Sequence, residues 1–108
     1  MSTWKTAVVG LGYVGLPLAV ALARHGSVTG YDHDPVRIRE LQGGHDRTGE
    51  VTRETLAEAA IRLTTEDSAL SGHDIYIITV PTPVDHTNVP DLAAVASACH
   101  TIGQVMSA

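Results

Sequence analysis

The chain has 108 residues, enough for one domain in which helices cover a single sheet. Hydrophobic residues make up 44% and aromatic residues 4%, with no Phe, so we expect a folded core of Val, Leu, Ile and Ala. The net charge of −5 disfavours nucleic acid and anionic membranes as general partners. The single cysteine excludes an internal disulfide and fits a reducing, cytoplasmic location.

The N-terminal third carries a glycine motif between two predicted strands. A strand at residues 5–9 leads into Gly10-Leu11-Gly12-Tyr13-Val14-Gly15, which overlaps the start of an apolar helix at 13–25. A second strand at 27–31 ends on Asp32, about 20 residues after the second glycine of the motif. This order of strand, G-x-G-x-x-G, helix and acidic strand end is typical of a dinucleotide-binding turn.

Each part of the motif has a physical task in such a site. Gly10 permits a sharp turn, Gly12 lets a pyrophosphate approach the backbone, and Gly15 lets the helix pack closely. The helix N-terminus offers free N–H groups to the phosphates. Asp32 would accept hydrogen bonds from the adenosine ribose hydroxyls, and its charge would repel a 2′-phosphate. We therefore expect NAD to be preferred over NADP.

Three other interpretations of this segment fit less well. Residues 6–23 carry no charge, follow Lys5 and end on Ala21-Leu22-Ala23, as in a secretory signal, but three glycines and Pro17 interrupt the run. The same interruptions, in so short a run, argue against a transmembrane helix. A phosphate-binding P-loop is excluded because Leu16-Pro17 stands where Lys-Ser/Thr is required.

The remaining chain alternates helices and strands. We expect helices from Pro35 to the Gly43-Gly44 pair and at 53–60, 65–70 and 91–107, strands at 61–63 and 75–80, and irregular segments at 43–52 and 81–90. Asp34, Thr52 and Asp91 are predicted helix caps. The continuously apolar strand at 75–80 is typical of one buried on both faces.

Apolar stripes indicate which helix faces are buried. The predicted stripes are Val14, Leu18, Ala19, Leu22 and Ala23; then Val36, Ile38 and Leu41; and finally Leu92, Val95, Ala96, Cys99, Ile102 and Met106. Cys99 on the last stripe is expected to be a buried structural thiol and not a nucleophile. The six histidines lack ligand spacing, so we place them on the surface and predict no metal site. Apart from Asp32 and the caps, the acidic residues form no predicted paired site.

The alternation predicts an α/β fold: a Rossmann-type doubly wound parallel sheet in the strand order 3-2-1-4, within one NAD-binding domain over residues 1–108. In this order the fourth strand lies beside the first, and ligands bind beyond the carboxyl ends of the strands at that point. The loop Pro81-Thr82-Pro83 should therefore lie next to the glycine motif.

Three stretches together resemble the N-terminal domain of the UDP-sugar 6-dehydrogenases, the family of UDP-glucose and GDP-mannose dehydrogenases. They are Gly10 to Pro17, Asp32 with Arg37, and Val80-Pro81-Thr82-Pro83 followed by Pro90-Asp91-Leu92. The last stretch is most similar to the branch that acts on UDP-N-acetylhexosamines such as UDP-GalNAc and UDP-GlcNAc. The UDP-glucose branch more often reads Gly-Thr-Pro in that loop.

The resemblance implies oxidation of a sugar C6 alcohol to a carboxylate in two hydride transfers to two NAD⁺. It places Tyr13 and Val14 in the pyrophosphate turn and Asp32 with Arg37 at the adenosine ribose. Thr82 would border the nicotinamide half, and Pro81 beside it would also bind the cofactor. For Arg37 the residues alone leave three alternatives: pairing with Asp32, stacking on adenine, or a solvated place on the helix surface.

Complete enzymes of this family also have a second domain for the UDP-sugar and a nucleophilic cysteine, and we expect them to be homo-oligomers. None of these parts is expected within this chain, so it should bind NAD without turnover and holds no predicted catalytic residue. The alternative is a stand-alone module that senses NAD(H) or another adenine nucleotide. Such a sensor would share the glycine motif and Asp32 but would not need Pro81-Thr82-Pro83. A fragment of a 6-phosphogluconate-like or hydroxyacid dehydrogenase is a third option.

Overall fold

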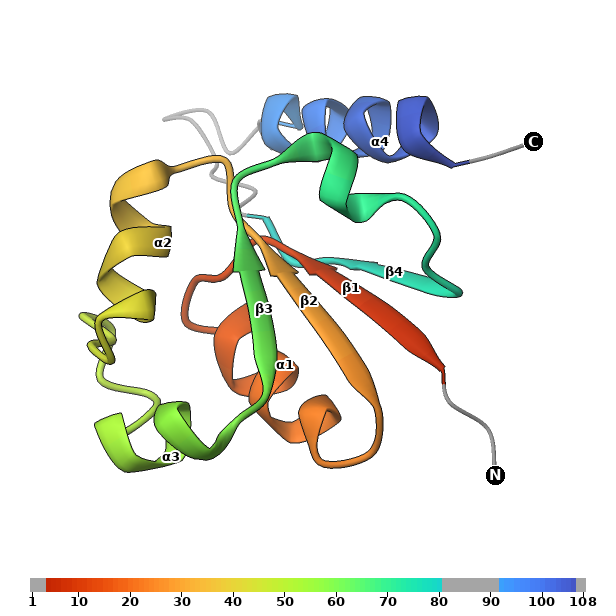
Figure 1. The fold of residues 1–108 in the computed structure, drawn as a ribbon. Helices are drawn as coiled ribbons and strands as arrows, with labels where there is room; N and C mark the ends of the chain where they lie inside the picture. The colour runs from red at the N-terminus through yellow and green to blue at the C-terminus, as the bar shows by residue number, and fades with distance from the viewer. Residues whose placement is uncertain (1–3, 81–91, 107–108) are drawn as a thin grey trace.

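A computed structural model describes residues 4–80 and 92–106 of the chain. Four parallel strands form one sheet in the order β3-β2-β1-β4, which confirms the predicted α/β architecture (Figure 1). The strands are β1 Lys5–Val9, β2 Ser27–Tyr31, β3 Ile61–Thr64 and β4 Ile75–Ile78. The first two have the bounds predicted from the sequence, and β3 is one residue longer.

Helices cover both faces of this sheet (Figure 1). The helices α1 Gly15–Ala23, α2 Pro35–Gln42 and α3 Arg53–Glu58 share one core with β1 and β2. The 3₁₀ helix η1 Asp67–Leu70 and α4 Ala93–Val105 pack over the opposite face, where Leu70, Ala98 and Ile102 are buried. The result is the three-layer arrangement expected of a parallel sheet.

The register of the strands brings their carboxyl ends to one edge. Val9 of β1 pairs with Tyr31 of β2 and with Ile78 of β4. The residues that follow these three therefore meet at the same place. A ligand site in a doubly wound sheet is expected there, where the strand order reverses.

Two of the predicted helix caps are present in the structure. The Asp34 side chain accepts a hydrogen bond of 2.9 Å from the Val36 N–H, with Pro35 in the first position of α2. The Thr52 hydroxyl accepts one of 3.1 Å from the Thr55 N–H and starts α3. Both satisfy N–H groups that lack a partner within the helix. The third predicted cap, Asp91, lies outside the described residues.

The predicted buried stripe of α1 is wrong, because the helix is rotated about its axis so that a different side faces the sheet. The buried residues are Gly15, Leu16, Ala19 and Val20, whereas Val14 is 53% exposed and Leu18, Leu22 and Ala23 are only partly buried. This helix is apolar on nearly every side, so its pattern does not reveal which side faces the sheet. The close approach at Gly15 sets that rotation instead. The helix is also shorter than predicted, because residues 12–14 belong to the turn.

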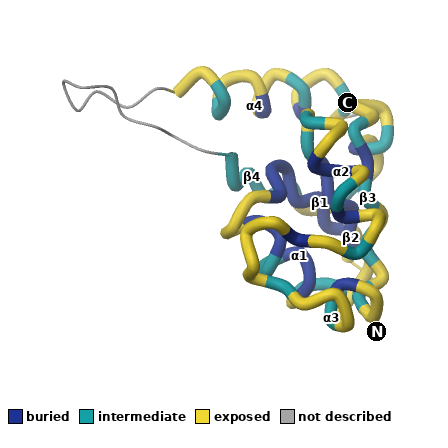
Figure 2. Tube along the Cα trace, turned by 90° about the vertical axis from the view of Figure 1, so that its left-hand side faces the viewer, coloured by how far each residue is buried: buried dark blue, intermediate teal, exposed yellow. Residues whose placement is uncertain are grey.

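The face of α4 was also predicted incorrectly, and Cys99 is exposed. Ala98 and Ile102 are buried, and Val95 and Val105 are partly buried, whereas Leu92 and Met106 are 59% and 55% exposed. Figure 2 shows the exposed outer side along this helix. Packing against η1 and β4 selects the stripe at 98, 102 and 105 in a helix that carries apolar residues on both sides.

β4 is less buried than its apolar sequence predicts. In the described part of the chain it pairs with β1 and forms an edge of the sheet. Ile75 is 41% exposed, and Tyr76, Ile77 and Ile78 are half-buried. The expectation of burial on both faces is therefore wrong for these residues. β4 also ends earlier than predicted, although the Thr79 N–H still donates to the Val9 carbonyl at 2.8 Å.

Candidate cofactor site

The glycine motif forms a tight turn between β1 and α1. Gly10 has a backbone φ of 101°, which residues other than glycine rarely adopt. Its N–H donates a hydrogen bond of 2.8 Å to the Tyr31 carbonyl oxygen. At Gly15, a Cβ atom would lie 1.8 Å from the Gly10 carbonyl oxygen. The sharp turn at the first glycine and the close packing at the third are thus confirmed.

The middle of the turn is open. A Cβ atom at Gly12 would have no neighbour within 4 Å, so a ligand can approach the backbone at this point. Tyr13 and Val14 are 70% and 53% exposed. The N-terminus of α1 has no side-chain cap and no acidic residue in its first turn. Because uncapped N–H groups and the positive end of the helix dipole attract phosphate, this geometry fits the pyrophosphate of a dinucleotide.

Asp32 lies directly beside this turn. Its Oδ2 accepts a hydrogen bond of 2.9 Å from the Leu11 N–H, and its Oδ1 accepts one of 3.0 Å from the Asp34 N–H. Each carboxylate oxygen has two lone pairs, so both oxygens can still accept a ribose hydroxyl. The contact with ribose remains a prediction, but the carboxylate lies where that prediction requires it.

Thr79, which the sequence interpretation did not single out, joins β4 to the turn. Its hydroxyl donates to the Gly10 carbonyl at 2.6 Å. A Cβ atom at Gly15 would lie 2.3 Å from the same hydroxyl. Thr79 therefore fixes the turn from the side of β4. The neighbouring residues Pro81 and Thr82 lie outside the described residues, and their predicted contacts with the cofactor stay predictions.

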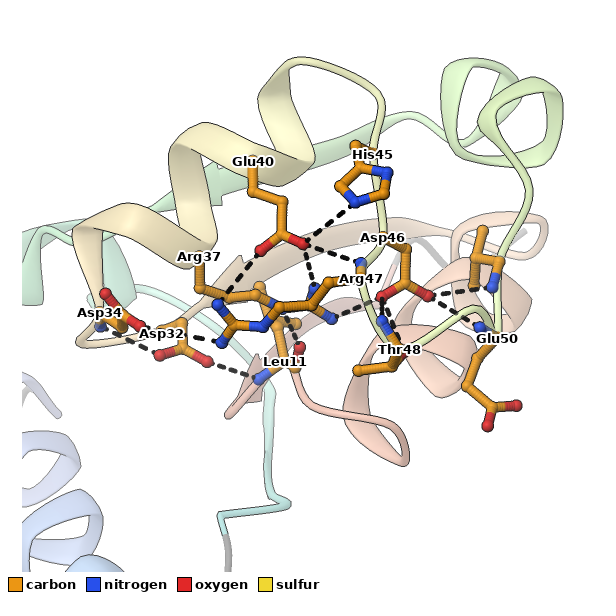
Figure 3. Close-up of polar contacts among 11 residues, drawn as sticks. Leu11, Asp32, Asp34, Arg37, Glu40, His45, Asp46, Arg47, Thr48 and Glu50 are labelled. Atoms are coloured by element: carbon orange, nitrogen blue, oxygen red, sulfur yellow. Dashed lines mark hydrogen bonds and ion pairs between the residues drawn. The ribbon is translucent and has the colours of Figure 1, made fainter.

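Arg37 is buried beneath the turn (Figure 3). Its Nε donates a hydrogen bond of 2.7 Å to the Leu11 carbonyl oxygen. Its guanidinium lies 3.0 Å from Asp46 and 3.4 Å from Glu40, measured between nitrogen and carboxylate oxygen. The alternative of a solvated arginine on the helix surface is therefore wrong. A direct contact between Arg37 and the cofactor stays a prediction.

Asp46 organises the segment 43–52, which we expected to be irregular. Its carboxylate accepts hydrogen bonds of 2.7 to 3.0 Å from the Thr48 hydroxyl and from the N–H groups of Thr48, Glu50 and Val51. Burial raises the pKa of Asp46, but the hydrogen bonds from Thr48, Arg37 and Val51 outweigh this and lower the pKa to about 2.

Asp46 and Glu40 both form ion pairs with Arg37, an arrangement that the sequence interpretation did not single out. Two local signals were present in the sequence. Arg37 and Glu40 are three residues apart on a helix, and Asp46-Arg47-Thr48 has the order of an Asx turn.

The predicted surface position of the histidines holds for His25, His33, His45 and His100 but not for His73, and His86 lies outside the described residues. His73 is half-buried, with Nε2 2.7 Å from the Thr29 hydroxyl and Nδ1 3.0 Å from the Leu70 carbonyl oxygen. Among residues 4–80 and 92–106 there is no group of three or more His, Cys, Asp or Glu side chains that could hold a metal ion. Over the same residues, no helix has the length and apolar character needed to span a bilayer.

Residues 4–108 match the description "UDP-glucose/GDP-mannose dehydrogenase family, NAD binding domain". The chain is 46% identical over 101 residues to "Protein CapL" of Staphylococcus aureus, covering 94% of this chain and 24% of that protein. It is 44% identical over 107 residues to the UDP-N-acetyl-D-glucosamine 6-dehydrogenase of Pseudomonas aeruginosa, covering 98% and 25%. The solved UDP-D-ManNAc dehydrogenase of Pyrococcus horikoshii superposes with a TM-score of 0.82 at 35% identity, covering 94% and 26%. The chain thus spans about a quarter of the length of these relatives.

Proposed function

This chain belongs to the UDP-glucose/GDP-mannose dehydrogenase family as its NAD-binding domain, and from this premise we propose that it serves a UDP-N-acetylhexosamine 6-dehydrogenase. The proposed reaction oxidises the C6 alcohol of the sugar to a carboxylate and uses two NAD⁺, each of which accepts one hydride. The chain would contribute cofactor binding, and the substrate domain and catalytic residues would come from other parts of the enzyme.

The observation that carries the cofactor role is the hydrogen bond of 2.9 Å between the Leu11 N–H and the Asp32 carboxylate. It joins the strand end that would hold the ribose to the turn that would hold the pyrophosphate. The open backbone at Gly12 and the uncapped start of α1 support the same assignment. These features lie together at the carboxyl edge of the sheet, where doubly wound folds bind their ligands.

The proposed contacts divide the cofactor into three parts. The pyrophosphate lies on the glycine turn, the adenosine ribose lies at the end of β2, and the nicotinamide half lies beside the loop after β4. The corresponding residues are Gly10, Leu11, Gly12, Tyr13, Val14 and Gly15; Asp32 and Arg37; and Pro81 and Thr82.

The proposed substrate class has support from two relatives that are named for UDP-N-acetylhexosamines, one for the glucosamine form and one for the mannosamine form. We further propose that the complete enzyme is a cytoplasmic homo-oligomer without nucleic acid or membrane partners. The alternative of a stand-alone nucleotide sensor has no support from the relatives, which are named as dehydrogenases.

Calorimetric titration of the chain with NAD⁺, NADP⁺ and AMP tests the cofactor role. We expect NAD⁺ to bind more tightly than NADP⁺, and Asp32→Asn to weaken NAD⁺ binding and narrow that preference. Asp74→Asn is the matched control, because Asp74 also accepts a backbone hydrogen bond of 2.9 Å, from the Lys5 N–H at the opposite end of the sheet. Tighter binding of NADP⁺ by the wild-type chain would refute the role of Asp32.

The substrate class is tested in the complete enzyme by following NADH formation with a panel of UDP-sugars. We expect two NADH for each UDP-N-acetylhexosamine consumed and slower oxidation of UDP-glucose. Preferred oxidation of UDP-glucose would contradict the proposed substrate class but would leave the cofactor role intact.

A further inference from the structure

The backbone of Leu11 is held at its N–H and at its carbonyl oxygen by two side chains from later in the sequence. Its N–H donates to Asp32 at 2.9 Å, and its carbonyl oxygen accepts from Arg37 Nε at 2.7 Å. Leu11 itself is fully buried between the first two glycines of the turn. The carbonyl that Arg37 binds belongs to the peptide bond between Leu11 and Gly12, so any rotation of that peptide would also move Gly12, where the pyrophosphate is proposed to bind. The two side chains therefore control the shape of the turn.

Arg37 can hold this carbonyl only if its charge is balanced, because its side chain is 3% exposed. A buried guanidinium without a counter-ion is strongly unfavourable. Asp46 provides the nearer carboxylate, 3.0 Å away, and its own side chain has no exposed surface. Glu40 is 3.4 Å away but lies also 3.6 Å from Arg47, so it is shared between two cations. Asp46 is consequently the counter-ion that fixes Arg37.

Asp46 is itself held firmly in place. Four hydrogen bonds from residues 48–51 reach its two oxygens, so the loop wraps around the carboxylate (Figure 3). The chain of contacts therefore runs from the loop at 46–51, through the guanidinium on α2, to the peptide of the glycine turn. Each link is a direct contact between the two groups that it joins.

We propose that Asp46 is a positioning residue of the NAD site: through Arg37 it sets the orientation of the peptide between Leu11 and Gly12 and hence of the turn that receives the pyrophosphate. This inference rests on the proposed function for its ligand, but the contacts stand without it. Asp46 would touch neither cofactor nor substrate. Its effect on binding would be transmitted by the ion pair with Arg37 and the hydrogen bond from Nε to Leu11.

Asp46→Asn tests the inference, because it removes the charge while keeping the shape of the side chain. With the ion pair lost, we expect NAD⁺ to bind about tenfold more weakly, the effect of roughly one charge-assisted hydrogen bond. We also expect the Leu11 amide to exchange its hydrogen about tenfold faster in the ligand-free chain, since its bond to Asp32 would open more often. Arg37→Lys should have both effects, because one ammonium cannot reach Leu11 and Asp46 in the same geometry.

Thr52→Ala is the matched control. Thr52 caps α3 just beyond the same loop, and its loss should lower the free energy of unfolding by a comparable amount without touching Arg37. All measurements are made at a temperature where each variant is fully folded, as shown by circular dichroism. A purely structural role for Asp46 predicts that Thr52→Ala and Asp46→Asn behave alike, and this result would overturn the inference.

The exchange measurement separates this inference from the proposed function. If the wild-type chain does not bind NAD⁺, the proposed function of the chain fails, but the Leu11 amide still reports whether Asp46 orients the turn. If Asp46→Asn keeps both wild-type NAD⁺ affinity and wild-type Leu11 protection, the inference is overturned while the proposed function stands. Faster exchange at Leu11 in Asp46→Asn and Arg37→Lys, with Thr52→Ala unchanged, supports it.

Discussion

The Thr79 hydroxyl donates a hydrogen bond of 2.6 Å to the carbonyl oxygen of Gly10, although the two residues are 69 positions apart in the chain. The bond connects the first glycine of the turn to the residue that directly follows β4. Thr79 is also in the path of any side chain at position 15. One hydroxyl thus links the two segments that would face the pyrophosphate and the nicotinamide half of NAD.

We predict that Thr79→Val destabilises the chain by about 1 to 2 kcal/mol, because it leaves the carbonyl of the buried residue Gly10 without this partner. Valine has nearly the same shape as threonine, so little of the loss would come from packing. Thr79→Ser keeps the hydroxyl and should retain most of the wild-type NAD⁺ affinity. Urea unfolding measures the free energy of unfolding of the variants, and calorimetric titration measures their NAD⁺ affinity. Equal stability of the wild-type and valine forms would show that the bond contributes nothing.

The second and third glycines of the motif should respond to alanine in opposite ways. Gly12→Ala has room for its methyl group, so we expect wild-type stability but no measurable NAD⁺ binding, because the methyl would occupy the place of the pyrophosphate. Gly15→Ala would place its methyl 1.8 Å from the Gly10 carbonyl oxygen. We expect this change to cost roughly 3 to 5 kcal/mol in the free energy of unfolding. Thermal unfolding and NAD⁺ titration of the two variants distinguish these outcomes, and a stable Gly15→Ala chain would contradict the prediction.

The features predicted correctly are those that a local pattern determines. The bounds of β1 and β2 follow from apolar runs next to turn residues, and the starts of α2 and α3 follow from Asp34 and Thr52. The strand order follows from the alternation of strands and helices, since parallel strands need crossover connections of one hand. The place of Asp32 beside the turn follows from that order.

The features missed depend on contacts between distant residues. The rotation of α1 is set by the approach of Gly15 to Gly10, and the buried face of α4 is set by η1, so neither can be derived from helices that are apolar on several sides. The role of Asp46 depends on a buried arginine nine positions earlier, across an irregular loop. Periodicity carries no information about such a pair.

Tyr31 should make the stability of the fold sensitive to alkaline pH. Burial raises the pKa of Tyr31, and a hydrogen bond of 2.5 Å to Asp67 together with the charges of Asp67 and Asp32 brings it to about 12. The folded chain therefore binds the phenol proton more tightly than the unfolded chain, in which the pKa is about 10. The stabilisation is complete below pH 10 and is lost as the pH rises through 12.

Tyr31→Phe tests this dependence. The variant lacks the phenol, so the difference in free energy of unfolding between it and the wild type should shrink as the pH rises from 9 to 12. Urea unfolding at several pH values gives that difference directly. A difference that stays constant across this range would contradict the raised pKa.

Asp46 should have the opposite dependence, at acidic pH. Its pKa is about 2 in the folded chain and has an ordinary value of 3.8, so the folded chain holds the carboxylate charged where the unfolded chain begins to bind a proton. The stabilisation is present above pH 3.8 and is lost as the pH falls through 2. We expect Asp46→Asn to be less stable than the wild type at pH 6, with a difference that narrows steadily towards pH 2. The other carboxylates titrate in both proteins, so the difference between their urea unfolding curves isolates Asp46. If the free energies of unfolding of the two proteins fall in parallel on acidification, the charge of Asp46 does not stabilise the fold through Arg37. The positioning role proposed for that charge would then lose its physical basis.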